Sequence, residues 1–155
     1  MYRTALIQLP LVRDTPSVVV RTPAQVAEMC SDVSDLAQET CLVMILNGKN
    51  RLICRCMVTI GTVNSSLISP NVIFRQAIIE HGAGIIVAHN HPSGSSSPSA
   101  EDIRITKQLI EAGKILDIPV LDHVILGKKT DTEPGFLSMR ESGVCDFSGK
   151  SVYHS

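Results

Sequence analysis

The chain has 155 residues, 44% of them hydrophobic, and its 14 basic side chains against 15 acidic ones leave a net charge of -1. This length suits a single domain that can bury a core of its own. The near-zero charge removes the simplest support for direct nucleic-acid binding, and no apolar run approaches the roughly 20 residues that span a bilayer.

Residues 1–21 form a mixed apolar and polar lead-in that could supply one edge strand. The sequence Thr22-Pro23-Ala24-Gln25 then has the pattern of a helix N-terminus, with a capping residue followed by proline at the first helical position. We therefore predict a helix over residues 23–36.

A hairpin should follow, because the apolar run 40–47 closes on Asn47-Gly48, the strongest short-range hairpin signal, and residues 51–59 would return antiparallel to it. Residues 61–69 are expected to be a loop. The pattern from Pro70 to Gly82 predicts a helix, and the run 83–89 predicts a buried strand. A strand, helix and strand in sequence favour a right-handed parallel crossover, so strand 83–89 should run parallel to strand 51–59 and antiparallel to strand 40–47.

A further helix should begin near Ser99, and residues 118–126 read as another buried strand. The fold class is therefore α/β, with a mixed sheet flanked by helices in a single domain. The tail 144–155 is polar, and we expect it to be poorly ordered unless it docks.

The cysteines are odd in number and follow no secretory segment, so we expect reduced thiols and a cytoplasmic location. Two of them stand two residues apart on a predicted strand and would share one face. We interpret them as core thiols, with a second metal site as the alternative. The five cysteines are Cys30, Cys41, Cys54, Cys56 and Cys145.

Two histidines and one aspartate carry the clearest chemistry. His89 and His91 lie two residues apart at a strand end, so their side chains can point to the same side, and Asp102 falls in the first turn of a helix whose side chains lean back toward the intervening loop. Two imidazoles and a carboxylate suit catalytic Zn²⁺, with a fourth position left for water. The alternative is a chance His-x-His beside an ordinary helix cap, with Ser99 as the cap and Asp102 favouring the helix dipole. Capping does not explain the paired histidines, and we favour the metal site.

A general base would be needed beside such a metal, and Glu39 is our candidate. It stands at the beginning of strand 40–47, whereas His89 stands at the end of a strand predicted to be antiparallel to it. Both residues should therefore lie at the same edge of the sheet.

These residues resemble the motif of the JAMM (JAB/MPN-type) zinc metalloproteases: a distant Glu, then His89-Asn90-His91-Pro92, then Pro98-Ser99, then Asp102. More closely, the chain resembles the bacterial RadC family, through the run from Gly61 to Asn64, the run His89 to Gly94, and Leu121-Asp122-His123. The resemblance covers about residues 22–143, and the main domain is assigned to that range.

The resemblance implies a cytidine deaminase-like JAMM/MPN core, zinc on His89, His91 and Asp102, and Glu39 as the base. It also implies that the Ser99 hydroxyl hydrogen-bonds a tetrahedral oxyanion. The expected reaction is hydrolysis of a peptide or isopeptide-linked protein substrate. Asp122 and His123 match the RadC signature but not the JAMM ligands, and we interpret them as supporting residues.

Two other functions are compatible with the sequence. One is a DNA-associated repair factor or phosphodiester hydrolase, which the even charge and the absence of tryptophan make less favourable. RadC proteins carry an N-terminal helical segment of a DNA-binding type, whereas only some twenty residues precede the first predicted helix here, so we do not expect direct nucleic-acid contact. The other is a non-catalytic interaction module. Apolar strand edges would also allow a homodimer.

Overall fold

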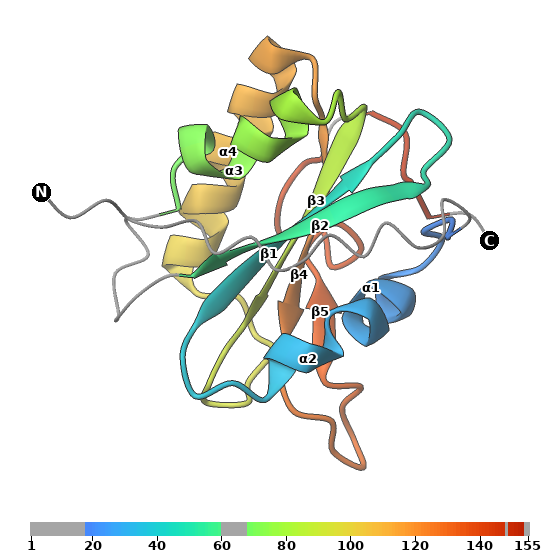
Figure 1. Ribbon diagram of the computed structural model, residues 1–155. Helices are drawn as coiled ribbons and strands as arrows, with labels where there is room; N and C mark the ends of the chain where they lie inside the picture. Colours follow the sequence, from blue (N-terminus) through green and yellow to red (C-terminus); the bar gives the residue numbers. More distant parts are fainter. Residues whose placement is uncertain (1–17, 60–67, 148, 154–155) are drawn as a thin grey trace, which may run out of the picture.

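A five-stranded sheet with helices on both faces organises the chain (Figure 1). The computed structural model describes residues 18–59, 68–147 and 149–153. Its strands are β1 (Thr40–Leu46), β2 (Leu52–Thr59), β3 (Gly84–Asn90), β4 (Val120–Leu126) and β5 (Phe136–Ser138). Its helices are α1 (Pro23–Met29), α2 (Ser31–Ser34), α3 (Pro70–Ile79) and α4 (Ala100–Leu116).

The sheet is mixed, with the strand order β2-β1-β3-β4-β5. β1 pairs antiparallel with both β2 and β3, β3 pairs parallel with β4, and β4 pairs antiparallel with β5. The predicted hairpin and the predicted directions of β2 and β3 are confirmed, as is the α/β fold class.

Successive residues of the strands face opposite layers, as the pleat of a sheet requires. On one face, Val43 of β1 packs in a cluster with Phe74 of α3 and Leu109 of α4. On the other face, Met44 of β1 packs in a cluster with Val26 of α1. Because β1 and β3 are buried throughout, they read as continuous apolar runs rather than alternating ones.

Two details differ from the sequence prediction, and two further predictions fall largely outside the described residues. The helix predicted over 23–36 is wrong as one element, because it breaks at Cys30, whose φ of -110° and ψ of 13° end α1 and begin α2. Strand β5 was not predicted, since it has three residues after a polar loop. The predicted edge strand falls largely outside the described residues, although Val19 forms an isolated antiparallel bridge with Arg51. Most of the predicted loop 61–69 also lies outside them.

The C-terminal segment docks on the face that α1 and α2 cover. Val152 is buried in the cluster on that face, and the Tyr153 hydroxyl donates a hydrogen bond to Asp122 at 2.5 Å. We expected this tail to be ordered only if it docks, and residues 149–153 do dock. Its apolar residues are few, which is why the stretch reads as polar in sequence.

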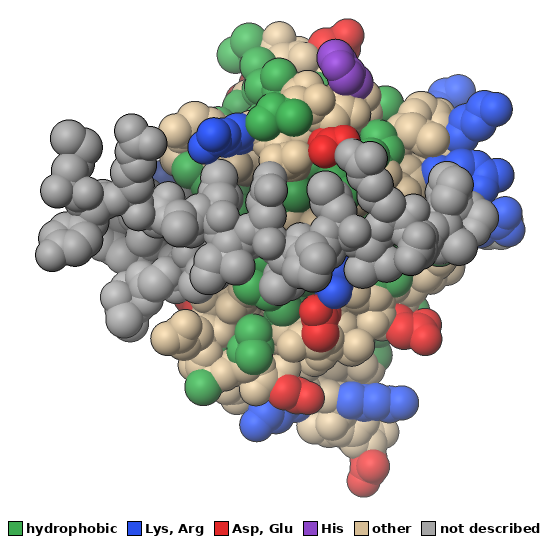
Figure 2. Space-filling model, viewed as in Figure 1, with side chains coloured by type: hydrophobic (Ala, Val, Ile, Leu, Met, Phe, Trp, Pro, Cys, Tyr) green, Lys and Arg blue, Asp and Glu red, His purple; other side chains and the backbone are tan. Residues whose placement is uncertain are grey.

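The distribution of charged side chains and the character of the helices bear on nucleic-acid binding and on membrane insertion. Lys and Arg side chains gather at the right-hand edge of the face in Figure 2, and basic and acidic side chains are interspersed below it. None of the helices in the described parts of the chain combines the length and the apolar character needed to cross a membrane.

The cysteines are free thiols, and Cys54 and Cys56 both pack at the cluster on the α3 and α4 face, as core thiols would.

Candidate metal centre

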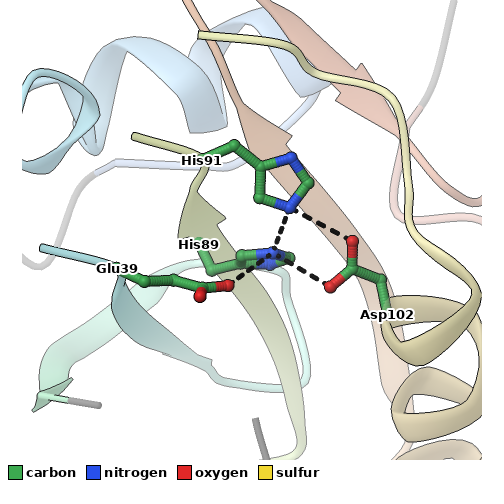
Figure 3. A group of neighbouring side chains, drawn as sticks. All are labelled: Glu39, His89, His91 and Asp102. Atoms are coloured by element: carbon green, nitrogen blue, oxygen red, sulfur yellow. Dashed lines mark hydrogen bonds and ion pairs between the residues drawn. The ribbon is translucent and has the colours of Figure 1, made fainter. Parts of the chain in front are cut away.

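The end of β3 presents two imidazoles to the start of α4 (Figure 3). His89 is the second-last residue of β3, and its side chain is 1% exposed. Cys41 of β1 is its partner in the β1–β3 register. His91 follows the strand, and its backbone N–H donates to the carbonyl of Leu126 at 2.9 Å. This bond continues the β3–β4 pairing by one residue and fixes where the second imidazole stands.

Four potential ligand atoms converge at this point. Atoms of Glu39, His89, His91 and Asp102 all lie within 4.8 Å of one another. The Nε2 atoms of the two histidines are 2.9 Å apart, His89 Nε2 lies 3.3 Å from Asp102 Oδ1, and His91 Nε2 lies 3.1 Å from Asp102 Oδ2. Glu39 Oε1 is farther, at 3.6 Å from His89 Nε2. The structure thus brings the three predicted ligands together and places the predicted base beside them.

The hydrogen bonds of His91 show which of its nitrogens is available. Its Nδ1 lies 2.8 Å from the carbonyl of Ser95, which can only accept, so Nδ1 carries the proton. When the ring is neutral, the lone pair of Nε2 therefore faces His89 and Asp102. This is the arrangement in which a histidine binds a metal ion.

The ionisable side chains of the site shift one another's pKa. Burial opposes ionisation of Asp102, but the adjacent His89 and His91 imidazoles outweigh it and hold the pKa of this carboxyl well below its ordinary value. The adjacent Asp102 carboxylate raises the pKa of His91, against the effect of burial, and the Ser95 carbonyl adds to the increase. A carboxylate that stays ionised beside two imidazoles forms a site that attracts a cation.

These residues fit a divalent metal ion of the zinc type. Two imidazole nitrogens and one carboxylate are borderline ligands that suit Zn²⁺, whereas calcium and magnesium prefer oxygen ligands alone. Zinc bonds of 2.0–2.1 Å at tetrahedral angles separate ligand atoms by about 3.3 Å. The three separations among His89, His91 and Asp102, from 2.9 to 3.3 Å, are close to that value.

Glu39 owes its position to the residue between the two histidines. The Asn90 side chain points to the opposite face of the sheet and is fully buried. Its Oδ1 accepts from Thr40 N at 2.6 Å, and its Nδ2 donates to the carbonyls of Leu36 and Gln38 at 3.1 and 3.0 Å. One amide therefore fastens the segment that carries Glu39 to the strand that carries the imidazoles. Sequence reasoning assigned Asn90 no role, and its place between the histidines was the only signal.

The comparison with known proteins agrees with this geometry. A family model described as "RadC-like JAB domain" matches residues 20–144. The chain belongs to this family. A UPF0758 protein from Desulforamulus reducens is 43% identical over 128 residues, which cover 82% of this chain and 54% of the relative. Another, from Pelobacter propionicus, is 47% identical over 113 residues, which cover 73% of this chain and 47% of the relative. The chain spans about half the length of these curated relatives.

In this RadC-like JAB domain, Ser99 caps the helix that carries Asp102. Its Oγ accepts from Asp102 N at 3.0 Å, and its N–H donates to Asp102 Oδ2 at 2.7 Å. The helix cap and the candidate metal site are therefore not alternatives, because the same aspartate takes part in both. The hydroxyl hydrogen of Ser99 is not used in the cap and is free to donate elsewhere.

Asp122 and His123 are consecutive residues of β4 and point to opposite faces of the sheet. Asp122 is fully buried and accepts from Ser138 Oγ at 2.6 Å and from Tyr153, so it holds the C-terminal segment. His123 faces the metal centre, where its Nε2 lies 2.6 Å from His89 Nδ1. Burial lowers the pKa of His123 well below its ordinary value, and the nearby His89 adds to this.

Proposed function

We propose that this RadC-like JAB domain is a zinc-dependent hydrolase that cleaves a peptide or isopeptide bond. The observation that carries the proposal is the convergence of Glu39, His89, His91 and Asp102 at one point between β3 and α4. A bound zinc ion would be held by His89, His91 and Asp102, and it would supply a Lewis acid and lower the pKa of water to about 7.

Glu39 is the proton carrier in this scheme. Its carboxylate is 31% exposed, so water and substrate can reach it, and its Oε1 lies 3.6 Å from His89 Nε2. At that place it can take the proton from the attacking water and return it to the amine as the scissile C–N bond breaks. Ser99 donates its free hydroxyl hydrogen to the oxygen of the tetrahedral intermediate.

Metal analysis and a substrate screen with matched variants test this proposal. Glu39→Gln should retain zinc, because Glu39 is not among the three ligands, yet lose hydrolysis by at least 100-fold, as general acid–base catalysis is worth about 10²–10⁴. Glu133→Gln, at an exposed position in a loop, is the matched control and should behave as the wild type.

The screen should include peptides, isopeptide-linked conjugates and oligonucleotides. Hydrolysis of a phosphodiester instead of an amide would replace the substrate class and leave the metal centre in place. A zinc-loaded wild-type protein that cleaves none of the three would favour an interaction module. Hydrolysis that survives Glu39→Gln would refute the assigned base.

A further inference from the structure

We propose that Thr106 and His123 act as positioning residues that fix the tautomer of His89, so that its Nε2 lone pair faces the metal centre. This inference rests on the proposed function for the identity of the centre. It concerns how the protein's own hydrogen bonds prepare a ligand before any metal arrives.

The argument begins at Thr106, one helical turn after Asp102. The Thr106 hydroxyl is fully buried and lies 2.6 Å from the backbone carbonyl oxygen of Asp102 and 2.6 Å from His123 Nδ1. It also lies 3.6 Å from the sulfur of Met139, which is a weak acceptor. The hydroxyl has a single hydrogen, and the carbonyl can only accept. At 2.6 Å two oxygen atoms without a hydrogen between them would repel, so Thr106 donates to Asp102.

The direction of the remaining bonds follows from that assignment. Because the Thr106 hydrogen is used, His123 Nδ1 must carry a proton and donate it to the threonine oxygen. The His123 ring is 1% exposed, and its partners are a hydroxyl and an imidazole rather than a carboxylate that would stabilise a second proton. The ring is therefore neutral, and its Nε2, which has no hydrogen, accepts. Its partner at 2.6 Å is His89 Nδ1, so the proton of His89 sits on Nδ1 and its Nε2 presents a lone pair.

The opposite arrangement would disable the ligand. If Thr106 donated to His123, then His123 would donate from Nε2 to His89, and the proton of His89 would lie on Nε2 among the other ligand atoms. The Asp102 carbonyl decides between the two arrangements. Asp102 thus contributes a carboxylate to the metal centre and, through its backbone, the acceptor that orients the buried chain of hydrogen bonds behind it.

Thr106→Val tests the role of the hydroxyl, since valine keeps the shape of threonine and removes the hydroxyl. We expect the zinc dissociation constant, measured by competition with a chromogenic chelator, to rise about 10- to 100-fold, the usual effect of losing a hydrogen-bond partner behind a histidine ligand. Thr106→Ser retains the hydroxyl and should remain within threefold of the wild type. Ser138→Ala is the matched control. It removes another buried hydroxyl with a 2.6 Å bond, to Asp122 on the other face, and should leave zinc affinity unchanged.

A second measurement addresses the tautomers directly and does not depend on a folded valine variant. In ¹⁵N-labelled wild-type protein, two-bond imidazole correlations should show His123 protonated at Nδ1 and His89 protonated at Nδ1, with zinc or without it. Protonation of His123 at Nε2 would overturn the inference. So would a Thr106→Val protein that binds zinc as tightly as the wild type, or a Ser138→Ala protein that loses affinity as much as Thr106→Val. A wild-type protein that binds no zinc would instead overturn the proposed function, and this inference with it.

Discussion

Substitution of Asn90 by aspartate changes one NH₂ group to oxygen. It should weaken the attachment of the segment before β1 without altering the side chains expected to bind the metal. The Asn90 amide donates to two carbonyls, at Leu36 and Gln38, and accepts from Thr40 N. A carboxylate can still accept from Thr40 N but would face both carbonyls with oxygen. Leaving a buried acceptor unpaired costs about 1–3 kcal/mol. For two lost bonds at a fully buried position we expect a decrease of about 2–4 kcal/mol in the free energy of unfolding.

The same substitution has a predictable dependence on pH. The introduced carboxyl would be buried among carbonyl oxygens, so its pKa in the folded state would rise above the unfolded value of about 3.9. The loss of stability should therefore be largest above the folded pKa. It should diminish as pH falls toward about 4, because the protonated acid can again donate one hydrogen bond.

Asn47→Asp provides a control with identical covalent chemistry. The Asn47 side chain accepts from Lys49 N at 2.9 Å and from Arg51 N at 3.1 Å, and a carboxylate can replace it in both bonds. Urea denaturation at pH 7 should show less than about 0.5 kcal/mol of change there. Zinc affinity should be retained in Asn90→Asp, whereas turnover should fall as Glu39 loses its position. An Asn90→Asp protein as stable as Asn47→Asp would refute the reasoning.

Four further outcomes are expected. Tyr153→Phe removes the bond to buried Asp122 and should lower the free energy of unfolding by about 1.5–3 kcal/mol in urea denaturation. Ser99→Gly should lose hydrolysis while costing only a few tenths of a kcal/mol as a helix cap, so a large drop in thermal stability would show that the hydroxyl is chiefly structural. Asp32→Asn should cost less than about 1 kcal/mol at pH 7, because the exposed pair with Arg55 is screened. Since the hydrogen bond from Arg55 lowers the pKa of Asp32, the difference should persist above about pH 4 and vanish as pH falls through the folded pKa. Zinc should dissociate on acidification as protons compete for the imidazoles, which chelator titrations at several pH values would measure.

Most of the sheet could be predicted from the sequence because its signals are local. Asn47-Gly48 specified the β1–β2 hairpin, and a crossover helix between β2 and β3 specified their common direction. From these two facts alone Glu39 and His89 fall at one edge of the sheet, where the structure places them. The convergence of His89, His91 and Asp102 could be predicted for the same reason, because the end of one strand and the start of one helix flank a short loop.

The supporting residues could not be predicted, because their partners are distant in sequence. Thr106 looks like an ordinary helix residue until His123 of β4 packs against it, and Asn90 donates to carbonyls more than fifty residues away. No local pattern distinguishes a threonine that anchors a histidine from one that fills space. The break at Cys30 was not predicted because the helical pattern continues through it, and neither glycine nor proline marks the end of α1 there.

The assembly of the centre from β1, β3 and α4 also has a consequence for folding. Glu39 and His89 meet only after β1 has paired with β3 across the intervening hairpin and helix, and Asp102 arrives only when α4 has docked. Such non-local pairings form late, because the loop between them must be closed before their contacts stabilise the chain. A metal ion would therefore bind the completed sheet and not its precursors. Metal binding would therefore increase the free energy of unfolding by RT ln(1 + [metal]/Kd), where [metal] is the concentration of free metal ion.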